Sequence, residues 1–301
     1  MKQIEKDYSS MQIYSPEQKI EHSLYTSKNI EVYLKRDDMI HPFISGNKWR
    51  KLKYNLQKAQ QENKQTLVTF GGAWSNHLLA TACAGATFQV KTIGFVRGED
   101  TRNPVLDMCT LFGMELRFVS REDYKDKFHL FEQLENKEEC YFIDEGGASV
   151  EATWGCKELL DELANTYDHI FCAAGTGTTA AGIALGISKN ELKTQLHVIP
   201  VLKNGGFILD EMKKYNAPIE KTTLHLDYHF GGYAKVKSEL IEFVKAYIQA
   251  TGVMIEPTYT GKAIFALHDL ISKDYFALGS KILFIHTGGL TGLLGQLEKF
   301  G

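Results

Sequence analysis

A lysine-rich segment, Ser45-Gly46-Asn47-Lys48-Trp49-Arg50-Lys51-Leu52-Lys53, combines an amine with conditions that favour its neutral form. We expect Ser45 or Asn47 to cap a helix whose apolar spacing begins at Trp49, which places Lys48 near the first turn. The positive end of the helix dipole and the cations of Arg50, Lys51 and Lys53 disfavour a charged Lys48 amine. An amine with a lowered pKa is a good Schiff-base nucleophile, although such charge runs are more often solvated helix surfaces.

A second polar segment, Gly71-Gly72-Ala73-Trp74-Ser75-Asn76-His77, directly follows an apolar run at 67–70. Ligand groups in open α/β sheets gather at the carboxyl ends of strands, and Ser75, Asn76 and His77 would open the next helix there. Their hydroxyl, amide and imidazole groups can hold a carboxylate or a phenolic oxygen. The same residue types fit a capped strand-to-helix turn equally well.

A third segment, Ala174-Gly175-Thr176-Gly177-Thr178-Thr179-Ala180, is typical of a phosphate loop. Glycines admit close backbone N–H groups, threonine hydroxyls add donors, and a helix N-terminus favours an anion. The GxGxxA spacing also occurs in dinucleotide-binding folds, which require an acidic residue after the next strand. Here Leu202-Lys203-Asn204 follows that expected strand, and no Walker lysine follows the glycines. We therefore predict a monophosphate site, with a dinucleotide-dependent oxidoreductase as the remote alternative.

Two later segments, Glu256-Pro257-Thr258-Tyr259-Thr260-Gly261-Lys262 and His286-Thr287-Gly288-Gly289, complete the candidates. Tyr259 can serve as a general acid or base, or stack on a ring, although most tyrosines are structural. Thr287 ends an expected strand, again at a carboxyl edge. We find no metalloprotease, nucleophile-elbow, EF-hand or paired-carboxylate pattern, and no metal site is predicted.

The elements that must position these residues follow from the hydrophobic pattern. Short apolar runs alternate with longer stretches whose apolar residues recur three and four apart, as in Trp49, Leu52, Leu56 and Ala59. This alternation predicts βαβ units and mostly parallel sheets. The expected strands are 67–70, 91–96, 115–119, 140–143, 170–173, 197–201 and 282–286.

The chain has 301 residues, enough for two domains of ordinary size. Residues 55–150 are expected to form a four-stranded α/β unit inserted into a larger domain made of 1–54 and 151–301. Both would be three-layer α/β domains.

Composition excludes several classes of function. A net charge of −3 without like-charge blocks gives no reason to expect nucleic acid or a membrane as partner. The polar stretch Met1–Ser10 has no signal-peptide core, and no apolar run approaches the ~20 residues that span a bilayer. The five cysteines form no CxxC pair, which favours a reducing cytoplasm over a disulfide framework or zinc site.

Together the five segments resemble one family, in order, from about Leu34 to Gly289. They are similar to the 1-aminocyclopropane-1-carboxylate deaminase and D-cysteine desulfhydrase family, which belongs to the tryptophan-synthase-β-like pyridoxal-phosphate enzymes of fold type II. The resemblance implies pyridoxal 5'-phosphate as cofactor, a small amino acid as substrate and a homodimer.

The resemblance also implies roles for individual residues. Lys48 is the Schiff-base lysine and then a proton-transfer base, and Ser75 binds the substrate carboxylate or relays a proton. Tyr233 and Tyr259 line the substrate side. The residues implied to hold the cofactor are Lys51 and Gly175, Thr176, Gly177, Thr178 and Thr179 at its phosphate, Asn76 at the ring O3′, Thr260 near the pyridine nitrogen and Thr287 beside the ring.

Two of these positions divide the family. Enzymes that open the cyclopropane ring carry Glu where this chain has Thr260, and Leu where it has Thr287. A carboxylate keeps the pyridine nitrogen protonated, which ring opening needs more than the elimination of a good leaving group. We therefore expect α,β-elimination on a small amino acid, most simply D-cysteine, to pyruvate, ammonia and sulfide. The alternatives are 1-aminocyclopropane-1-carboxylate deamination, another deaminase or racemase-like activity, and non-catalytic binding of the cofactor or a metabolite.

The chain departs from the family pattern beside two site residues. Gly231-Gly232-Tyr233-Ala234-Lys235 stands where a Gly-Tyr-Gly stretch is usual. Trp74 precedes Ser75 where better-known members have a smaller or polar residue. A bulky indole at that place is expected to narrow or reshape the pocket.

Overall fold

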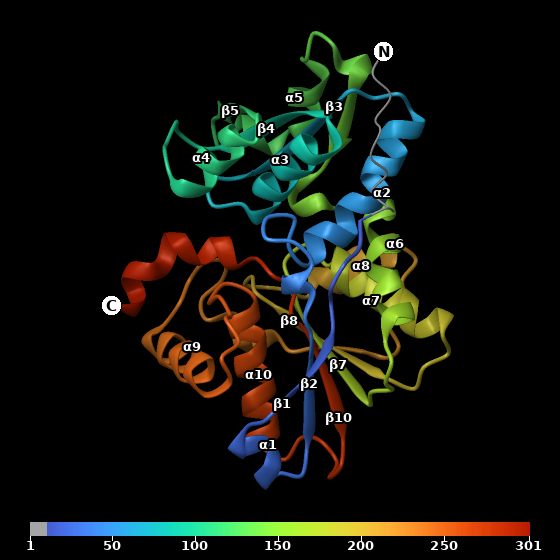
Figure 1. Ribbon diagram of the computed structural model, residues 1–301, viewed down its shortest axis with the longest axis vertical. Coiled ribbons are helices and arrows are strands. Elements are labelled where there is room, and N and C mark those ends of the chain that lie inside the picture. Colours follow the sequence, from blue (N-terminus) through green and yellow to red (C-terminus); the bar gives the residue numbers. More distant parts are fainter. Residues whose placement is uncertain (1–10) are drawn as a thin grey trace.

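Within residues 11–301, which the computed structural model describes, ten strands form two separate sheets (Figure 1). The larger sheet has the order β1-β2-β10-β7-β8-β9, and only β1 and β2 are antiparallel neighbours. The smaller sheet, β5-β4-β3-β6, is parallel throughout. The strands are β1 (Glu17–Ile20), β2 (Glu31–Lys35), β3 (Thr66–Gly72), β4 (Lys91–Arg97), β5 (Glu115–Val119), β6 (Cys140–Ile143), β7 (His169–Ala174), β8 (Gln195–Pro200), β9 (Thr222–Leu224) and β10 (Lys281–Ile285).

All seven predicted strands are confirmed, with bounds that differ from the prediction by at most two residues. The hydrophobic pattern missed β1, β2 and β9. In β2, buried Val32 and Leu34 alternate with polar or half-buried residues, so no continuous apolar run marks the strand. The strands β1 and β9 are the two edges of the larger sheet, and β9 has only three residues.

The larger sheet is buried on both faces, as the apolar run in β7 shows. Phe171 and Ala173 point into a core shared with α1, α9 and α10. Ile170, Cys172 and Ala174 point into the opposite core, shared with α7 and α8. Because successive side chains of a strand alternate between faces, a strand covered on both sides is apolar throughout. The helices are α1 (Ser23–Ser27), α2 (Asn47–Gln61), α3 (Asn76–Phe88), α4 (Pro104–Leu111), α5 (Lys127–Glu132), α6 (Val150–Glu158), α7 (Thr178–Lys189), α8 (Phe207–Lys214), α9 (Ser238–Thr251) and α10 (Thr260–Ser272).

The smaller sheet is also covered on both faces. Leu67 of β3 lies in a core with Leu52 of α2 and Ala80 of α3. Val68 and Phe70 face the other way, into a core that includes Tyr124 of η3 (Asp123–Lys125). The predicted architecture of two three-layer α/β units is therefore confirmed.

The predicted domain boundaries stay a prediction. The boundary at residue 54 lies inside α2, which packs against both α3 and α6 and so runs along both units (Figure 1). The expectation for Met1–Ser10 lies outside the described residues. The other 3₁₀ segments are η2 (Asp37–Met39), η4 (Lys137–Glu139), η5 (Glu145–Gly147), η6 (Leu159–Glu162), η7 (Leu226–His229) and η8 (Leu290–Phe300).

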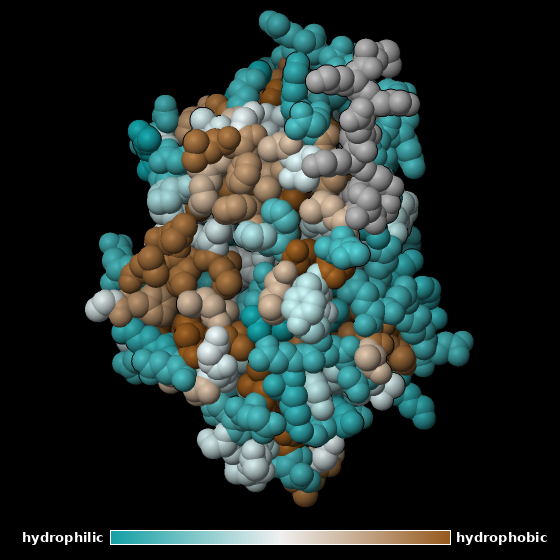
Figure 2. Space-filling model, in the orientation of Figure 1, coloured by the Kyte–Doolittle hydropathy of each residue, from teal (hydrophilic) through white to brown (hydrophobic). Residues whose placement is uncertain are grey.

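The C-terminal segment η8 lies between the smaller unit and α9, where it is drawn in red (Figure 1). Figure 2 shows apolar side chains gathered over this part of the surface, where Leu294 and Leu297 are exposed. All five cysteines are buried free thiols. None of the helices in residues 11–301 combines the length and apolar character needed to cross a membrane.

Candidate active site between the two sheets

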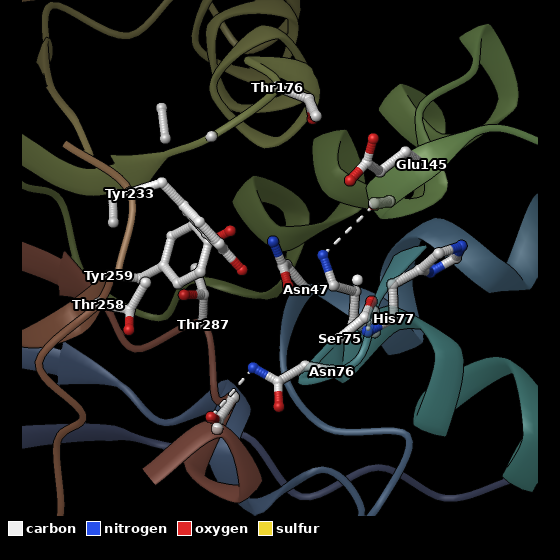
Figure 3. Close-up of a pocket in the computed structure, with 18 of the residues that line it drawn as sticks. Asn47, Ser75, Asn76, His77, Glu145, Thr176, Tyr233, Thr258, Tyr259 and Thr287 are labelled. Carbon is white, nitrogen blue, oxygen red and sulfur yellow. Dashed lines mark hydrogen bonds between the residues drawn. The ribbon is translucent and has the colours of Figure 1, made fainter. Parts of the chain in front are cut away.

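A cavity of about 770 Å³ opens where strands of both sheets end. Its wall includes Gly72 at the end of β3, Arg97 at the end of β4 and Ala174 at the end of β7. Figure 3 shows Asn76 on one side of this space and Tyr259 across from it. The carboxyl ends of parallel strands share one edge of a sheet, so loops distant in sequence converge there.

Lys48 is the second residue of α2 and borders the cavity. Its Nζ donates to the carbonyl oxygen of Gly146 at 3.3 Å, and Lys51 Nζ donates to the same oxygen at 3.0 Å. Burial lowers the pKa of Lys48 well below its usual value, and the charge of Lys51 lowers it further. Burial lowers the pKa of Lys51 to about 8. The amine best suited to act as a nucleophile is therefore that of Lys48.

The other two cations of the segment do not act on Lys48 as predicted. Arg50 makes a bidentate pair with buried Asp37, at 2.6 and 2.7 Å, and a further pair with Glu162. Lys53 pairs with Glu158 at 2.6 Å. These carboxylates neutralise both cations, so of the three neighbouring cations only Lys51 lowers the pKa of Lys48.

The predicted helix cap is also wrong. The N-cap of α2 is Gly46, with φ of 60°, and no side chain caps the helix. The backbone N–H of Asn47 instead donates to the carbonyl oxygen of Thr287 at 3.2 Å. A Cβ on residue 46 would overlap that carbonyl, so only glycine permits this close approach. The contact holds Thr287, which borders the cavity, against the start of α2.

The glycine-threonine loop enters the cavity at the first turn of α7. Gly177 is the N-cap with φ of 81° and has no side chain to cap the helix, whose first N–H groups have no intrahelical acceptor. Gly175, Thr176, Gly177 and Thr179 border the cavity, whereas the buried Thr178 does not. Asn47 Nδ2 donates to Thr179 Oγ1 at 3.0 Å, which ties the starts of α2 and α7 together.

Ser75 and Asn76 border the cavity at the start of α3. Ser75 Oγ accepts from the backbone N–H groups of His77 and Leu78, at 3.2 and 3.3 Å, so its own hydrogen remains for a ligand. The Asn76 amide is oriented by the C-terminal segment. Its Nδ2 donates to the Gly289 carbonyl at 3.1 Å, and its Oδ1 accepts from a threonine hydroxyl at 2.7 Å. One Asn76 N–H remains to donate.

His77 is buried behind these two residues. Its Nε2 lies 2.7 Å from Thr69 Oγ1, and its Nδ1 has no hydrogen-bond partner within residues 11–301. Burial lowers the pKa of His77 well below its usual value, and Lys48 and Lys51 lower it further. The imidazole is therefore neutral, with one polar atom unsatisfied at the cavity wall.

Tyr233 and Tyr259 form the opposite wall (Figure 3). Their ring centroids lie 5.9 Å apart with the rings at 70°. Burial raises the pKa of Tyr259 well above its usual value, and Tyr233 adds to this. Burial also raises the pKa of Tyr233, but a hydrogen bond from Tyr259 opposes the rise. Tyr233 is therefore the readier proton donor of the two.

Thr260 lies outside the cavity wall. It is fully buried, and its Oγ1 lies 3.2 Å from a carboxylate oxygen of Glu256. Glu256 borders the cavity and accepts from the backbone N–H groups of Thr258, Tyr259 and Thr260 at 2.6 to 2.8 Å. Sequence reasoning gave Glu256 no role. The signal was present, because an acidic residue just before a helix start is typical of a cap.

Gln296 is a second wall residue that the sequence did not indicate. It is buried, and its Nε2 donates to Thr258 Oγ1 at 2.8 Å. Trp74 lies beside it, with its indole so close to Gly295 that a Cβ there would come within 2.7 Å. Trp74 borders the cavity and packs against η8, and the expected narrowing or reshaping of the pocket stays a prediction. No local pattern could pair residues so far apart in the chain.

The donor set fits a phosphorylated aldehyde. The uncapped first turn of α7 and the nearby cation of Lys51 suit a phosphate group. The Lys48 amine suits a carbonyl carbon, and the remaining N–H of Asn76 suits a phenolic oxygen. A cavity of about 770 Å³ has room for such a cofactor together with a small substrate.

Comparison with known proteins agrees with this chemistry. Residues 19–288 match the model of the pyridoxal-phosphate dependent enzyme family. A Thermotoga maritima protein provisionally named 1-aminocyclopropane-1-carboxylate deaminase is 34% identical over 289 residues, which cover 89% of this chain and 91% of that protein. A second relative, 32% identical, is the mitochondrial bifunctional D-cysteine desulfhydrase/1-aminocyclopropane-1-carboxylate deaminase of Arabidopsis thaliana. The match covers 89% of this chain and 75% of that protein.

Solved structures give the same result. The crystal structure of a 1-aminocyclopropane-1-carboxylate deaminase homologue superimposes with a TM-score of 0.86 at 30% identity, over 96% of this chain and 94% of the other. A tomato threonine deaminase shares the fold, with a TM-score of 0.69 at 15% identity. These results rule out the dinucleotide-dependent oxidoreductase. The chain belongs to the family of pyridoxal-phosphate-dependent enzymes, within the group of 1-aminocyclopropane-1-carboxylate deaminases and D-cysteine desulfhydrases.

Proposed function

We propose that this enzyme catalyses α,β-elimination on D-cysteine, in which sulfide leaves and one water molecule then hydrolyses the remaining C–N bond, giving pyruvate and ammonia. The proposal rests on the two positions that divide the family, because this chain has threonine at both 260 and 287. The nearest carboxylate to Thr260 is that of Glu256, which is committed to three backbone N–H groups. A cavity without a free carboxylate at this place suits a good leaving group better than ring opening.

The residues proposed to hold pyridoxal phosphate come from both units of the fold. Lys48 Nζ would bind its carbonyl carbon, the loop from Gly175 to Thr179 with Lys51 its phosphate, and Asn76 its phenolic oxygen. When bound, pyridoxal phosphate withdraws electrons from the substrate's α-carbon and so makes the α-proton acidic. Thr260, buried against Glu256, would act on the ring nitrogen only through its surroundings.

The protein's own groups then move protons at defined atoms. Lys48 Nζ, once the substrate's amino group has displaced it from the cofactor, would take the proton from the substrate's α-carbon as a neutral amine, the form that burial favours. The free hydroxyl hydrogen of Ser75 binds the substrate carboxylate. The sulfur leaves the β-carbon with the C–S electron pair and takes a proton, which we assign to the hydroxyl of Tyr233. Tyr259 holds that hydroxyl in place.

The test is the visible absorption of the purified protein reconstituted with pyridoxal phosphate. We expect a band that borohydride removes, with the reduced label on Lys48, and a shift of the band on addition of D-cysteine. Sulfide and pyruvate should appear in equal amounts. Lys48→Ala should abolish turnover. Lys53→Ala, on the same helix as Lys48, removes a cation that is paired with Glu158 of α6, and this variant should keep its turnover. Full activity of Lys48→Ala would refute the mechanism, and a band without D-cysteine turnover would refute the substrate.

1-Aminocyclopropane-1-carboxylate is the second candidate substrate, because several relatives are named for its deamination. Ammonia release from it, at a rate above that of sulfide release from D-cysteine, would favour this alternative. L-Cysteine is the stereochemical control.

We also propose, from the family resemblance, that the enzyme is a cytoplasmic homodimer. Sedimentation equilibrium should give twice the chain mass of 34.0 kDa. A mass of one chain at micromolar concentration would refute the dimer. Cell fractionation with an antibody against the chain tests the compartment.

A further inference from the structure

Lys262 is a fully buried lysine that the proposed mechanism does not use. It lies in the first turn of α10 and is 0% exposed. Its Nζ donates to the carbonyl oxygen of Gly232 at 2.8 Å and to that of Val201 at 3.4 Å. A buried ammonium group is costly unless its hydrogen bonds are made, so these two carbonyls are held firmly to it.

The carbonyl that receives the shorter bond belongs to the residue directly before Tyr233. The backbone here is irregular, with φ of 100° at Gly231, 116° at Gly232 and 54° at Ala234. Neither a helix nor a strand therefore fixes the direction of the Tyr233 side chain. Tyr233 as a whole residue is 45% exposed, so the contact of its ring with Tyr259 leaves the adjoining backbone to be held by other groups.

The same lysine is electrostatically linked to the other tyrosine. Burial lowers the pKa of Lys262 to about 8, while the Glu256 carboxylate favours its charged form. Glu256 accepts the backbone N–H of Tyr259 at 2.8 Å. Glu256, just before α10, thus binds the backbone of Tyr259 through its carboxylate, and Lys262 in the first turn of α10 binds the residue before Tyr233 through its ammonium group.

We infer that Lys262 is a positioning residue, which holds Tyr233 against Tyr259 by binding the carbonyl oxygen of Gly232. Lys262 does not border the cavity and touches no reacting atom. The effect on catalysis rests on the proposed role of Tyr233 as proton donor, whereas the hold on the loop does not. The two parts can therefore be tested separately.

The direct readout is ¹⁹F NMR of the reconstituted enzyme with 3-fluorotyrosine at position 233. Lys262→Met keeps the length of the side chain and removes its donors. We expect it to shift or broaden the resonance, whereas Lys235→Met, an exposed lysine in the same loop, leaves the resonance unchanged. An unchanged resonance in folded Lys262→Met overturns the inference. If that variant does not fold, Lys262→Gln takes its place; its shorter side chain withdraws the donor from the Gly232 carbonyl, so the resonance should again shift or broaden, and an unchanged resonance again overturns the inference.

The kinetic readout is a double-mutant cycle with Tyr233→Phe. We expect Lys262→Met to lower kcat about tenfold with KM within about twofold, and to have no further effect in the Tyr233→Phe background. Effects that multiply in the double variant would show that Lys262 acts elsewhere and overturn the inference. Full kcat in Tyr233→Phe would refute the proposed role of Tyr233 alone, because the NMR result still decides the positioning.

Discussion

The side-chain nitrogens of Lys48 and Lys51 donate to one acceptor, the carbonyl oxygen of Gly146, at 3.3 and 3.0 Å. Two ammonium groups on one carbonyl repel each other, so the more strongly perturbed one loses its proton first. Lys48 carries the larger lowering of the pKa, and Lys51, with a pKa of about 8, stays charged at neutral pH. One helical turn thus carries a neutral amine, proposed as the nucleophile, and a charged amine, proposed to bind the phosphate.

The affinity for pyridoxal phosphate should fall as the pH rises above about 8. Burial lowers the pKa of Lys51 to about 8, and a bound phosphate favours its charged form, so binding above that pH must take up a proton. The limiting loss is about tenfold per pH unit. Lys51→Met should bind more weakly but without this additional pH dependence. Absorption titrations of the apoenzyme between pH 7 and 9.5 test this, with Lys53→Met as control. Identical pH dependence in Lys51→Met and the unmodified enzyme would contradict the prediction.

Gly46→Ala should destabilise the protein by more than about 3 kcal/mol, because a Cβ would overlap the Thr287 carbonyl oxygen. Gly252→Ala is the matched control. Gly252, at the end of α9, has a similar φ of 68°. A Cβ added to it would meet no atom of residues 11–301 within 4 Å. Gly252→Ala should lower the free energy of unfolding by only about 1 kcal/mol, which is the cost of placing alanine in a left-handed backbone conformation. Urea unfolding measures both values, and equal losses would show that the contact with Thr287 is unimportant.

Stability should fall in acid partly through Glu162. Burial alone would raise its pKa, but Arg50 and Lys35 outweigh this and hold the pKa below the usual 4.5. A carboxylate with a lowered folded pKa contributes its full stability above the unfolded pKa and loses it as the pH falls through the folded value.

Glu162→Gln should therefore cost about 1 kcal/mol at pH 7 and lose less stability than the unmodified protein between pH 5 and 3. Urea midpoints across this range provide the measurement. Asp161→Asn, next to it but paired with the exposed Lys189, is the control and should cost only a few tenths of a kcal/mol. A parallel pH profile for Glu162→Gln and the unmodified protein would refute the assignment.

Thr260→Glu should destabilise this enzyme rather than convert it to ring opening. Thr260 is fully buried, and its Oγ1 lies 3.2 Å from Glu256 Oε1, so a second carboxylate would meet the first. An uncompensated buried charge costs about 3–5 kcal/mol. Thr260→Val, which loses one hydrogen bond, should cost about 1 kcal/mol. Thermal unfolding compares the two, and the additional change Glu256→Gln should recover part of the loss. A stable Thr260→Glu with new activity on 1-aminocyclopropane-1-carboxylate would contradict this account.

Much of the fold could be read from the sequence. Seven strands were predicted because strands buried on both faces are continuous apolar runs, as in β7 (His169–Ala174). Lys48 was placed in the first turn of a helix because apolar spacing begins beside it. The glycine-threonine loop was correctly placed at a helix start because it directly follows an apolar run, while its binding of a phosphate stays a prediction. Each of these properties depends on neighbours in the chain.

Other features of the site depend on residues that are distant in the chain. Gly46 is the N-cap of α2 because the Thr287 carbonyl occupies the space beside it. Arg50 and Lys53 do not act on Lys48 because carboxylates more than ten residues away neutralise them. Whether a side chain borders the cavity, as Gln296 does and Thr260 does not, is likewise set by packing. Residue types and their local periodicity follow from the chain alone, whereas the pairing of charges and the shape of the cavity depend on which strand ends, distant in sequence, meet at one edge.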